Sequence, residues 1–211
     1  MSARPPIHGV YAIIDPAACG ERLVVAVARM ALDGGARVVQ WRDKRRDKGD
    51  QLADAREIVR LCELSRALCI VNDHADLAAA VRAHGVHVGQ HDLPVEAVRL
   101  ILGAEAVIGV STNNADEAIA AERLGADYVA VGAIFPTSSK EVTRVADVDR
   151  IRAVKAAVRI PVVAIGGINA SNVAQAIDAG ADAAAVIGAI CGADDPRAAT
   201  IELAGAFGAR P

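Results

Sequence analysis

Eight short apolar segments, rich in β-branched residues, alternate along the chain with eight longer segments of helical period. The expected strands span residues 10–15, 37–43, 68–73, 85–89, 106–111, 128–135, 161–167 and 182–190. The expected helices span residues 21–33, 50–66, 75–83, 94–102, 114–124, 146–158, 170–179 and 195–207. Strands that are apolar at nearly every position, each followed by a helix, are typical of a parallel sheet covered by helices.

A similar phrase recurs where a helix gives way to a strand: "DGGARVV", "AHGVHVG", "RLGADYVAVG" and "DAGADAAAVIG". In each we expect the helix to end at the glycine, which adopts a left-handed cap conformation without strain. The recurrence indicates one repeated βα unit, and we predict an α/β fold, a single (β/α)8 TIM barrel over residues 1–211. That barrel needs at least about 200 residues. An open doubly wound sheet is the alternative.

Composition restricts the classes of function. The chain is 53% hydrophobic but 2% aromatic, so its core must consist mainly of Ala, Val, Ile and Leu. The formal net charge is -3 and no basic run stands out, which argues against nucleic acid or a membrane as partner. The four cysteines form no CxxC pair, which favours reduced thiols in a cytoplasmic protein. The sequence is compatible with a homo-oligomer but does not fix the oligomeric state.

Polar residues gather where the expected strands end, and the C-terminal ends of the strands carry the active sites of TIM barrels. In "QWRDK", strand alternation puts Gln40, Arg42 and Lys44 on one side and Trp41 and Asp43 on the other. The first three suit a phosphate or pyrophosphate, and Trp41 would face the helices. A solvated strand end is an equally good interpretation of this segment alone.

Two carboxylates end neighbouring expected strands. Asp73 follows "IVN" and Asp92 follows "GQH", and carboxylates in such a position repel each other unless a cation joins them. A few carboxylates together with substrate phosphates are the usual ligands of Mg²⁺. Taken singly, each aspartate is better explained as a helix N-cap.

Four histidines and a glycine pair also belong to these tips. His74, His84, His87 and His91 suggest zinc, but their spacing crosses a helix end, a strand and a loop, so outer-sphere roles for His74 and His91 fit better. "AIGGIN" is similar to the barrel phosphate site, where Gly167 would let a phosphate approach the main chain.

Taken together, the tips resemble the thiamin phosphate synthase family. The resemblance rests on "QWRDK", "NDHADLA", "GVHVGQHDLP", "IGVS", "IFPTSSK", "IPVVAIGGI" and "AGADAAAVIGAI", in family order over nearly the whole chain. It implies a (β/α)8 barrel and a transferase of thiamine biosynthesis. Such an enzyme joins hydroxymethylpyrimidine pyrophosphate to a thiazole phosphate, with release of pyrophosphate.

The resemblance also implies roles for individual residues. The pyrimidine pyrophosphate would be bound by Gln40, Trp41, Arg42, Asp43, Lys44, Asn72, Ser111 and Lys140. The thiazole phosphate would be bound by Thr137, Ser138, Ser139, Gly167, Ile187 and Gly188. Asp73 and Asp92 would bind Mg²⁺, and Arg42, Lys44 and Lys140 would be catalytic, because they neutralise the departing pyrophosphate.

Some positions depart from the family pattern. Asp43 stands where Glu is common, His74 and His91 replace frequent acidic residues, and Gly188 replaces a Ser that commonly binds the thiazole phosphate. Two other functions fit the same barrel: a thiazole tautomerase, which needs no pyrophosphate site, and a non-catalytic protein that binds a phosphorylated metabolite.

Overall fold

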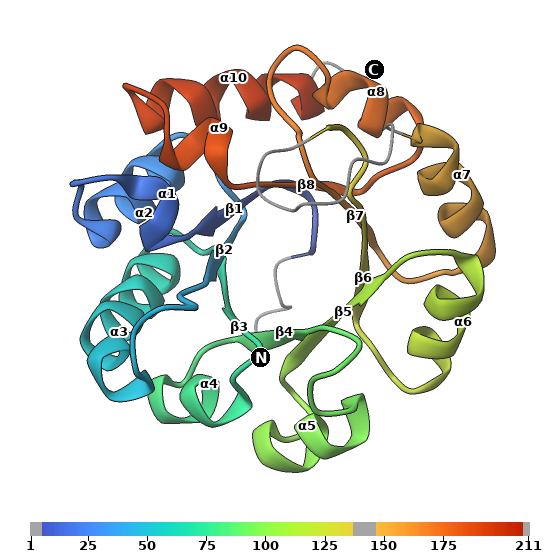
Figure 1. Ribbon diagram of the computed structural model, residues 1–211, viewed down its shortest axis with the longest axis horizontal. Helices are drawn as coiled ribbons and strands as arrows, with labels where there is room; N and C mark the ends of the chain where they lie inside the picture. Colours follow the sequence, from blue (N-terminus) through green and yellow to red (C-terminus); the bar gives the residue numbers. More distant parts are fainter. Residues whose placement is uncertain (1–5, 137–146, 209–211) are drawn as a thin grey trace.

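The computed structural model describes residues 6–136 and 147–208, and its eight strands close into a parallel barrel in sequence order (Figure 1). Every strand pairs with the next, and β1 pairs with β8. The strands are β1 Gly9–Ile14, β2 Val38–Trp41, β3 Leu68–Asn72, β4 Gly85–Val88, β5 Val107–Thr112, β6 Tyr128–Val131, β7 Val162–Ile165 and β8 Ala183–Val186. The predicted TIM barrel is therefore confirmed, and the open sheet is wrong.

The helices form an outer ring around the barrel (Figure 1). They are α1 Pro16–Cys19, α2 Val24–Asp33, α3 Lys48–Leu64, α4 Ala75–Val81, α5 Val95–Leu102, α6 Ala115–Arg123, α7 Val148–Ala157, α8 Val173–Asp178, α9 Gly188–Cys191 and α10 Pro196–Gly208. In the described part of the chain, none of them combines the length and hydropathy that a membrane-spanning helix requires.

The sixth and eighth predicted strands extend four residues too far at their C-terminal ends. The sixth ends at Val131 and not at residue 135, and the eighth ends at Val186. Residues Gly188–Cys191 form the short helix α9 instead, although their side chains are as apolar as those of a strand. Apolar character alone does not distinguish a buried strand from a buried helical turn.

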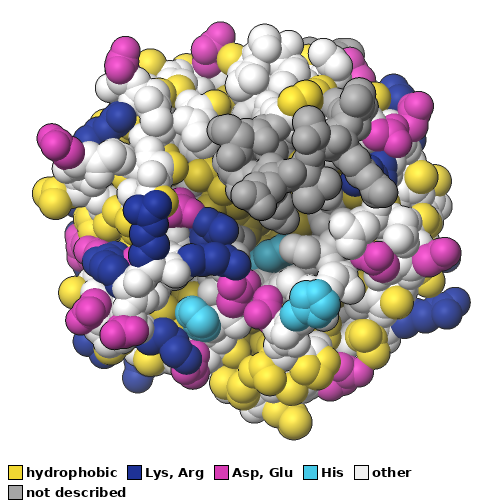
Figure 2. Space-filling model, in the orientation of Figure 1, with side chains coloured by type: hydrophobic (Ala, Val, Ile, Leu, Met, Phe, Trp, Pro, Cys, Tyr) yellow, Lys and Arg dark blue, Asp and Glu magenta, His cyan; other side chains and the backbone are white. Residues whose placement is uncertain are grey.

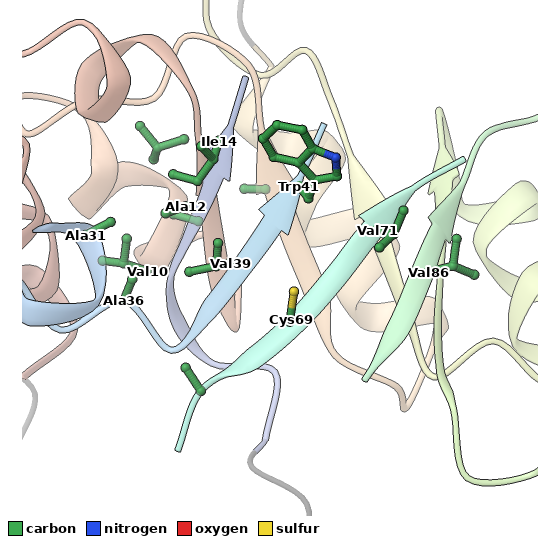
Figure 3. Close-up of a cluster of buried hydrophobic side chains, with 14 of the residues drawn as sticks. Val10, Ala12, Ile14, Ala31, Ala36, Val39, Trp41, Cys69, Val71 and Val86 are labelled. Carbon is green, nitrogen blue, oxygen red and sulfur yellow. The ribbon is translucent and has the colours of Figure 1, made fainter. Parts of the chain in front are cut away.

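Strand alternation divides the buried residues into two cores. Outward side chains such as Val39, Trp41 and Val71 pack beneath the helices, and Figure 3 shows part of this layer. Inward side chains such as Tyr11 and Val163 fill the barrel. The strands therefore bury both faces, which explains their nearly continuous apolar sequence.

The recurring phrase places a hydrogen-bond acceptor at the start of two strands. Asp127, directly before β6, accepts a hydrogen bond of 2.8 Å from the backbone N–H of Ile108 in β5. Asp182, directly before β8, accepts one of 2.7 Å from the N–H of Val162 in β7. Each carboxylate also pairs with a basic side chain of α5 or α7. The repeated "GAD" thus joins the N-terminal ends of successive strands.

His84 performs the same task before β4. Its Nδ1 accepts a hydrogen bond of 3.0 Å from the N–H of Cys69 in β3. Arg37 holds the corresponding position before β2, where its own N–H donates to Val10, but its guanidinium has no lone pair to accept with. The acceptor therefore recurs at β4, β6 and β8, in every second βα unit.

The predicted glycine caps are confirmed at three of the four phrases. Gly35, Gly125 and Gly180 have φ of 99°, 89° and 101°. The prediction is wrong at Gly85, because α4 is capped by Arg82 at φ 56° and Gly85 is already in β4. Glycine is required there for space, since a β-carbon would lie 1.8 Å from the carbonyl oxygen of Val107.

We expect Asp182→Ala to lower the free energy of unfolding by about 1–3 kcal/mol, because the buried N–H of Val162 loses its acceptor. Urea denaturation measures this loss. The matched control is Asp194→Ala, at an exposed aspartate, for which the change should stay within about 0.5 kcal/mol. Equal effects in the two variants would contradict the assigned role of Asp182.

Candidate active site

A cavity of about 1010 Å³ opens at the C-terminal ends of the strands, and all eight strands contribute to its lining. In Figure 2, Lys and Arg side chains lie beside Asp, Glu and His side chains around the central hollow. Ten of the residues predicted from the sequence line this cavity: Gln40, Arg42, Lys44, Asn72, Asp73, Asp92, Ser111, Gly167, Ile187 and Gly188. Thr137, Ser138, Ser139 and Lys140 lie outside the described residues, so their placement stays a prediction.

Trp41 and Asp43 are not among the lining residues, contrary to the assignment of the whole segment 40–44 to a substrate. Trp41 packs beneath the helices, where its Nε1–H donates to Gln51 of α3 at 3.0 Å. Asp43 is buried and accepts backbone hydrogen bonds from Arg45 and Arg46. The outward direction of both side chains follows from strand alternation, which a contiguous assignment ignores.

The pKa of Asp43 lies below its usual value. Burial acts to raise this pKa, but hydrogen bonds from the backbone of Arg45 and from both the side chain and the backbone of Arg46 outweigh burial. The charged Asp43 therefore shapes the loop after β2, from which Arg42 and Lys44 reach the cavity.

The cationic side of the cavity consists of Arg42 and Lys44. Arg42 forms an ion pair with Asp15, and the Nζ of Lys44 lies 3.2 Å from a carboxylate oxygen of Asp73. Asp15 also caps α1 by accepting from the N–H of Ala17 at 2.9 Å. The buried Asp15 thus orients the Arg42 guanidinium. Sequence reasoning missed Asp15, although it ends the first expected strand and precedes a proline.

The two candidate metal ligands lie at the tips of β3 and β4. Asp73 has φ 62°, and its N–H donates to the carbonyl of His87 at 2.8 Å. Asp92 accepts a hydrogen bond of 2.7 Å from the N–H of Gly89. The N-caps of the following helices are His74 and Pro94, so the N-cap interpretation of both aspartates is wrong.

Mg²⁺ prefers oxygen ligands, and the carboxylates of Asp73 and Asp92 are ligands of that kind. Across residues 6–136 and 147–208, no three His, Cys, Asp or Glu side chains group closely enough to hold a metal ion. A cation bound by Asp73 and Asp92 would therefore need ligands from a substrate or water. His91 lines the cavity beside Asp92, whereas His74 is not among the lining residues.

A largely buried network of hydrogen-bonded side chains crosses the barrel beneath the charged residues of the rim. The Nε2–H of Gln40 donates to the hydroxyl of Tyr11 at 2.7 Å, and the two tyrosine hydroxyls lie 2.9 Å apart. The hydroxyl of Tyr128 lies 3.0 Å from His87 Nδ1, and His87 Nε2 lies 2.9 Å from the Oγ of Ser111. Five strands, β2, β1, β6, β4 and β5, thus contribute one polar side chain each. All five side chains line the cavity.

Packing holds this network of side chains in place. The rings of His87 and Tyr128 are stacked, with centroids 5.5 Å apart. Gly109 makes room for the tyrosine, because a β-carbon there would lie 2.0 Å from Tyr128 Cζ. Burial lowers the pKa of His87 to about 4, against a smaller opposing effect of Asp92, so the imidazole is neutral near pH 7.

Sequence reasoning missed Tyr11 and Tyr128 and gave His87 no role. The signal in the sequence was that tyrosine is rare in this chain, which contains only two. Both lie within expected strands, where a hydroxyl needs a partner once it is buried.

Gly167 and Gly188 line another part of the cavity, in the segments that follow β7 and β8. Gly167 has φ 64°, and a β-carbon there would lie 2.4 Å from the carbonyl oxygen of Pro136. Contact with the chain itself is therefore enough to require glycine at this position, and the predicted approach of a phosphate to Gly167 stays a prediction. Gly188 begins α9 after Ile187, and no atom crowds the position of its missing β-carbon.

The family model described as thiamine monophosphate synthase matches residues 10–190. The chain belongs to this family. The thiamine-phosphate synthase of Chromobacterium violaceum is 47% identical over 98% of this chain and 99% of its own length. The thiamine biosynthesis bifunctional protein ThiED of Geobacter sulfurreducens is 43% identical over 97% of this chain, which spans 41% of that longer protein.

A solved structure agrees with these sequence matches. The thiamine phosphate pyrophosphorylase of Pyrococcus furiosus superimposes with a TM-score of 0.87 at 36% identity and covers 97% of both chains. The resemblance to the thiamin phosphate synthase family is therefore confirmed, and members of this family are transferases.

We expect the stability of the protein to fall by about 2 kcal/mol between pH 7 and pH 5 through His87 alone. Its pKa is 6.5 in the unfolded chain and about 4 in the folded protein, so the unfolded chain binds the proton first. This contribution is fully present above pH 6.5 and is lost as the pH falls toward 4. Urea unfolding at both pH values measures it.

The control for this titration is His87→Gln, which should lose about 2 kcal/mol less than the unaltered protein over the same range. His84, whose pKa burial also lowers, is present in both proteins and cancels. An identical pH dependence would show that His87 is not buried in neutral form.

Proposed function

We propose that this protein is a thiamine-phosphate synthase, which joins hydroxymethylpyrimidine pyrophosphate to a thiazole phosphate. The bond between the pyrimidine methylene carbon and the pyrophosphate oxygen breaks, and the thiazole nitrogen forms a new bond to that carbon. Pyrophosphate leaves. Membership of the family and the convergence of cations, carboxylates and amides in one cavity support this proposal.

In this proposal Arg42 and Lys44 bind the pyrophosphate. Its departure transfers negative charge onto the leaving oxygen, and fixed cations stabilise that charge more than they stabilise the ground state. The ion pair with Asp15 supplies the fixed orientation of Arg42. Lys140, which lies outside the described residues, would add a third cation.

Asp73 and Asp92 would hold Mg²⁺ together with oxygens of the pyrophosphate. When bound, this ion neutralises charge on the pyrophosphate and orients it. Lys44 would then lie between the carboxylate and the anion, since its ammonium is 3.2 Å from Asp73.

Ile187 and Gly188 would bind the thiazole phosphate at the start of α9, close to Gly167. The backbone amide of Gly188 would donate to a phosphate oxygen, in place of the hydroxyl that a serine would offer. Thr137, Ser138 and Ser139 would complete this second site.

The reaction requires no protein nucleophile. His87 would be the obvious general base in the described cavity, yet both of its nitrogens are engaged, one with Tyr128 and one with Ser111. Binding two substrates in line supplies the acceleration that acid–base chemistry does not.

We propose further that the protein works in the cytoplasm on these small molecules and not on nucleic acid. The net charge of -3 and the four free cysteines support this setting. A homo-oligomer is compatible with the proposal.

The convergence of Arg42, Lys44, Asp73 and Asp92 in one cavity is the observation on which the proposal rests. An assay with both substrates and Mg²⁺ tests it, with pyrophosphate and thiamine phosphate as the measured products. Isomerisation of the thiazole phosphate without pyrophosphate release would identify a tautomerase instead. Binding of both compounds without any product would identify a non-catalytic barrel.

We expect Asp92→Ala to reduce turnover at least ~100-fold, because the pyrophosphate loses its bound cation. Titration calorimetry should also show that Mg²⁺ no longer strengthens pyrophosphate binding. The control Asp76→Ala removes a carboxylate that pairs with Lys48 on the surface and should change turnover less than about twofold. Equal activity of Asp92→Ala and the unaltered protein would rule out the metal assignment.

A further inference from the structure

The hydrogen-bonded network of five side chains has two ends that face the cavity, Gln40 and Ser111. The direction of its hydrogen bonds decides whether each end offers a donor or an acceptor to a ligand. Gln40 Nε2 is used by Tyr11, whereas no described residue bonds to its Oε1. All fully buried side-chain nitrogens and oxygens in the described residues have partners, so this Oε1 must be accessible from the cavity. The hydroxyl of Ser111 forms the other end.

The direction of the hydrogen bonds follows from counting hydrogens. Gln40 donates to Tyr11, so the hydroxyl hydrogen of Tyr11 points to Tyr128, and that of Tyr128 points to His87 Nδ1. Because His87 Nδ1 accepts this hydrogen, the ring carries its own hydrogen on Nε2 and donates it to Ser111. The reverse direction between the tyrosines would leave the Tyr11 hydrogen without an acceptor among the described residues, at a cost of about 1–3 kcal/mol.

We propose that Tyr11, Tyr128 and His87 are positioning residues that form a one-way hydrogen-bond relay, which makes Gln40 present an acceptor and Ser111 a donor to the substrate. Such a pair complements a ring with an amino group beside an unprotonated ring nitrogen, as in the aminopyrimidine of the proposed reaction. The inference rests on the proposed function and adds to it the means by which this ring is selected.

The relay predicts rejection of the opposite pattern. An analogue with oxygen in place of the amino group offers an acceptor there and, in its keto form, a hydrogen on the adjacent ring nitrogen. It would meet Gln40 Oε1 with an acceptor and the Ser111 hydroxyl with a donor. A site built to hydrogen-bond one pattern rejects the other strongly, because its own polar groups are left unpaired.

The test compares kcat/KM for the amino substrate and the oxo analogue in the unaltered protein and in Tyr128→Phe. This substitution keeps the ring against Gly109 and removes the hydroxyl at the centre of the relay. We expect the preference for the amino substrate to fall at least ~10-fold, while KM for the thiazole phosphate changes less than about twofold. Comparison of the two proteins cancels the different intrinsic reactivities of the two pyrimidines.

The control is Thr200→Val, which removes another buried hydroxyl, one that donates to Pro196 in α10 and does not line the cavity. It should leave the preference unchanged. An unchanged preference in Tyr128→Phe, in a protein that turns over the amino substrate normally, would overturn the relay and leave the proposed function intact. No turnover of either pyrimidine by the unaltered protein would overturn both.

The tautomer of His87 provides a test that needs neither substrate nor a variant of Tyr128. Long-range ¹H–¹⁵N correlation spectra of the unaltered protein should show a protonated Nε2 and an unprotonated Nδ1 for His87, assigned by the loss of its signals in His87→Gln. A hydrogen on Nδ1 would reverse the direction of the relay and overturn the inference, even if Tyr128→Phe proved too unstable to assay.

Discussion

Closure of eight parallel strands into a ring is the constraint on which every other feature of this protein depends. Parallel strands of one sheet all point the same way, so closure brings eight strand ends to one rim. Side chains alternate between the two faces of each strand, so the same closure fixes which residues enter the barrel. Arg42, Asp73, Asp92 and Gly188 lie in different βα units and meet for this reason alone.

The barrel is held differently at its two ends. At the N-terminal end, His84, Asp127 and Asp182 accept hydrogen bonds from the neighbouring strand in every second unit. These bonds add to the ladder between strands. At the C-terminal end the polar groups face the cavity, and ion pairs such as Arg42–Asp15 hold them in position. The additional hydrogen bonds between strands and the cavity therefore lie at opposite ends of the same strands.

The interior itself is unusual in being polar across its middle. Burying Tyr11, Gln40, His87 and Tyr128 is costly unless each finds a hydrogen-bond partner, and in this barrel each does, with the half-buried Ser111 as the partner of His87. The arrangement depends on small residues nearby, above all Gly109, which leaves room for the Tyr128 ring. Because each internal link of this network joins one donor to one acceptor, the network also fixes which groups its two ends, Gln40 and Ser111, offer to the cavity.

The fold was predictable from sequence because strand and helix periods are local signals, and the recurring phrase marked the repeated unit. The rim was predictable in part, because a strand exit can be recognised without knowing its neighbours. Contacts between distant strands were not predictable from the sequence. Nothing near Tyr11 in the sequence indicates that it contacts Tyr128, and the role of Asp15 becomes visible only from its ion pair with Arg42. Trp41 and Asp43 show the opposite failure, since alternation already turned them outward while the family pattern suggested substrate contact. The end of β8 was misjudged because an apolar helical turn looks like a strand.

In the proposed function, one cavity holds the phosphates of both substrates at separate places on its rim. A crystal structure with thiamine phosphate, pyrophosphate and Mg²⁺ bound would test it most directly. We expect pyrophosphate against Arg42 and Lys44, with the ion on Asp73 and Asp92, and the ester phosphate at Ile187 and Gly188. Density for either phosphate at the N-terminal end of the barrel, or outside the cavity, would show that the proposed arrangement is wrong.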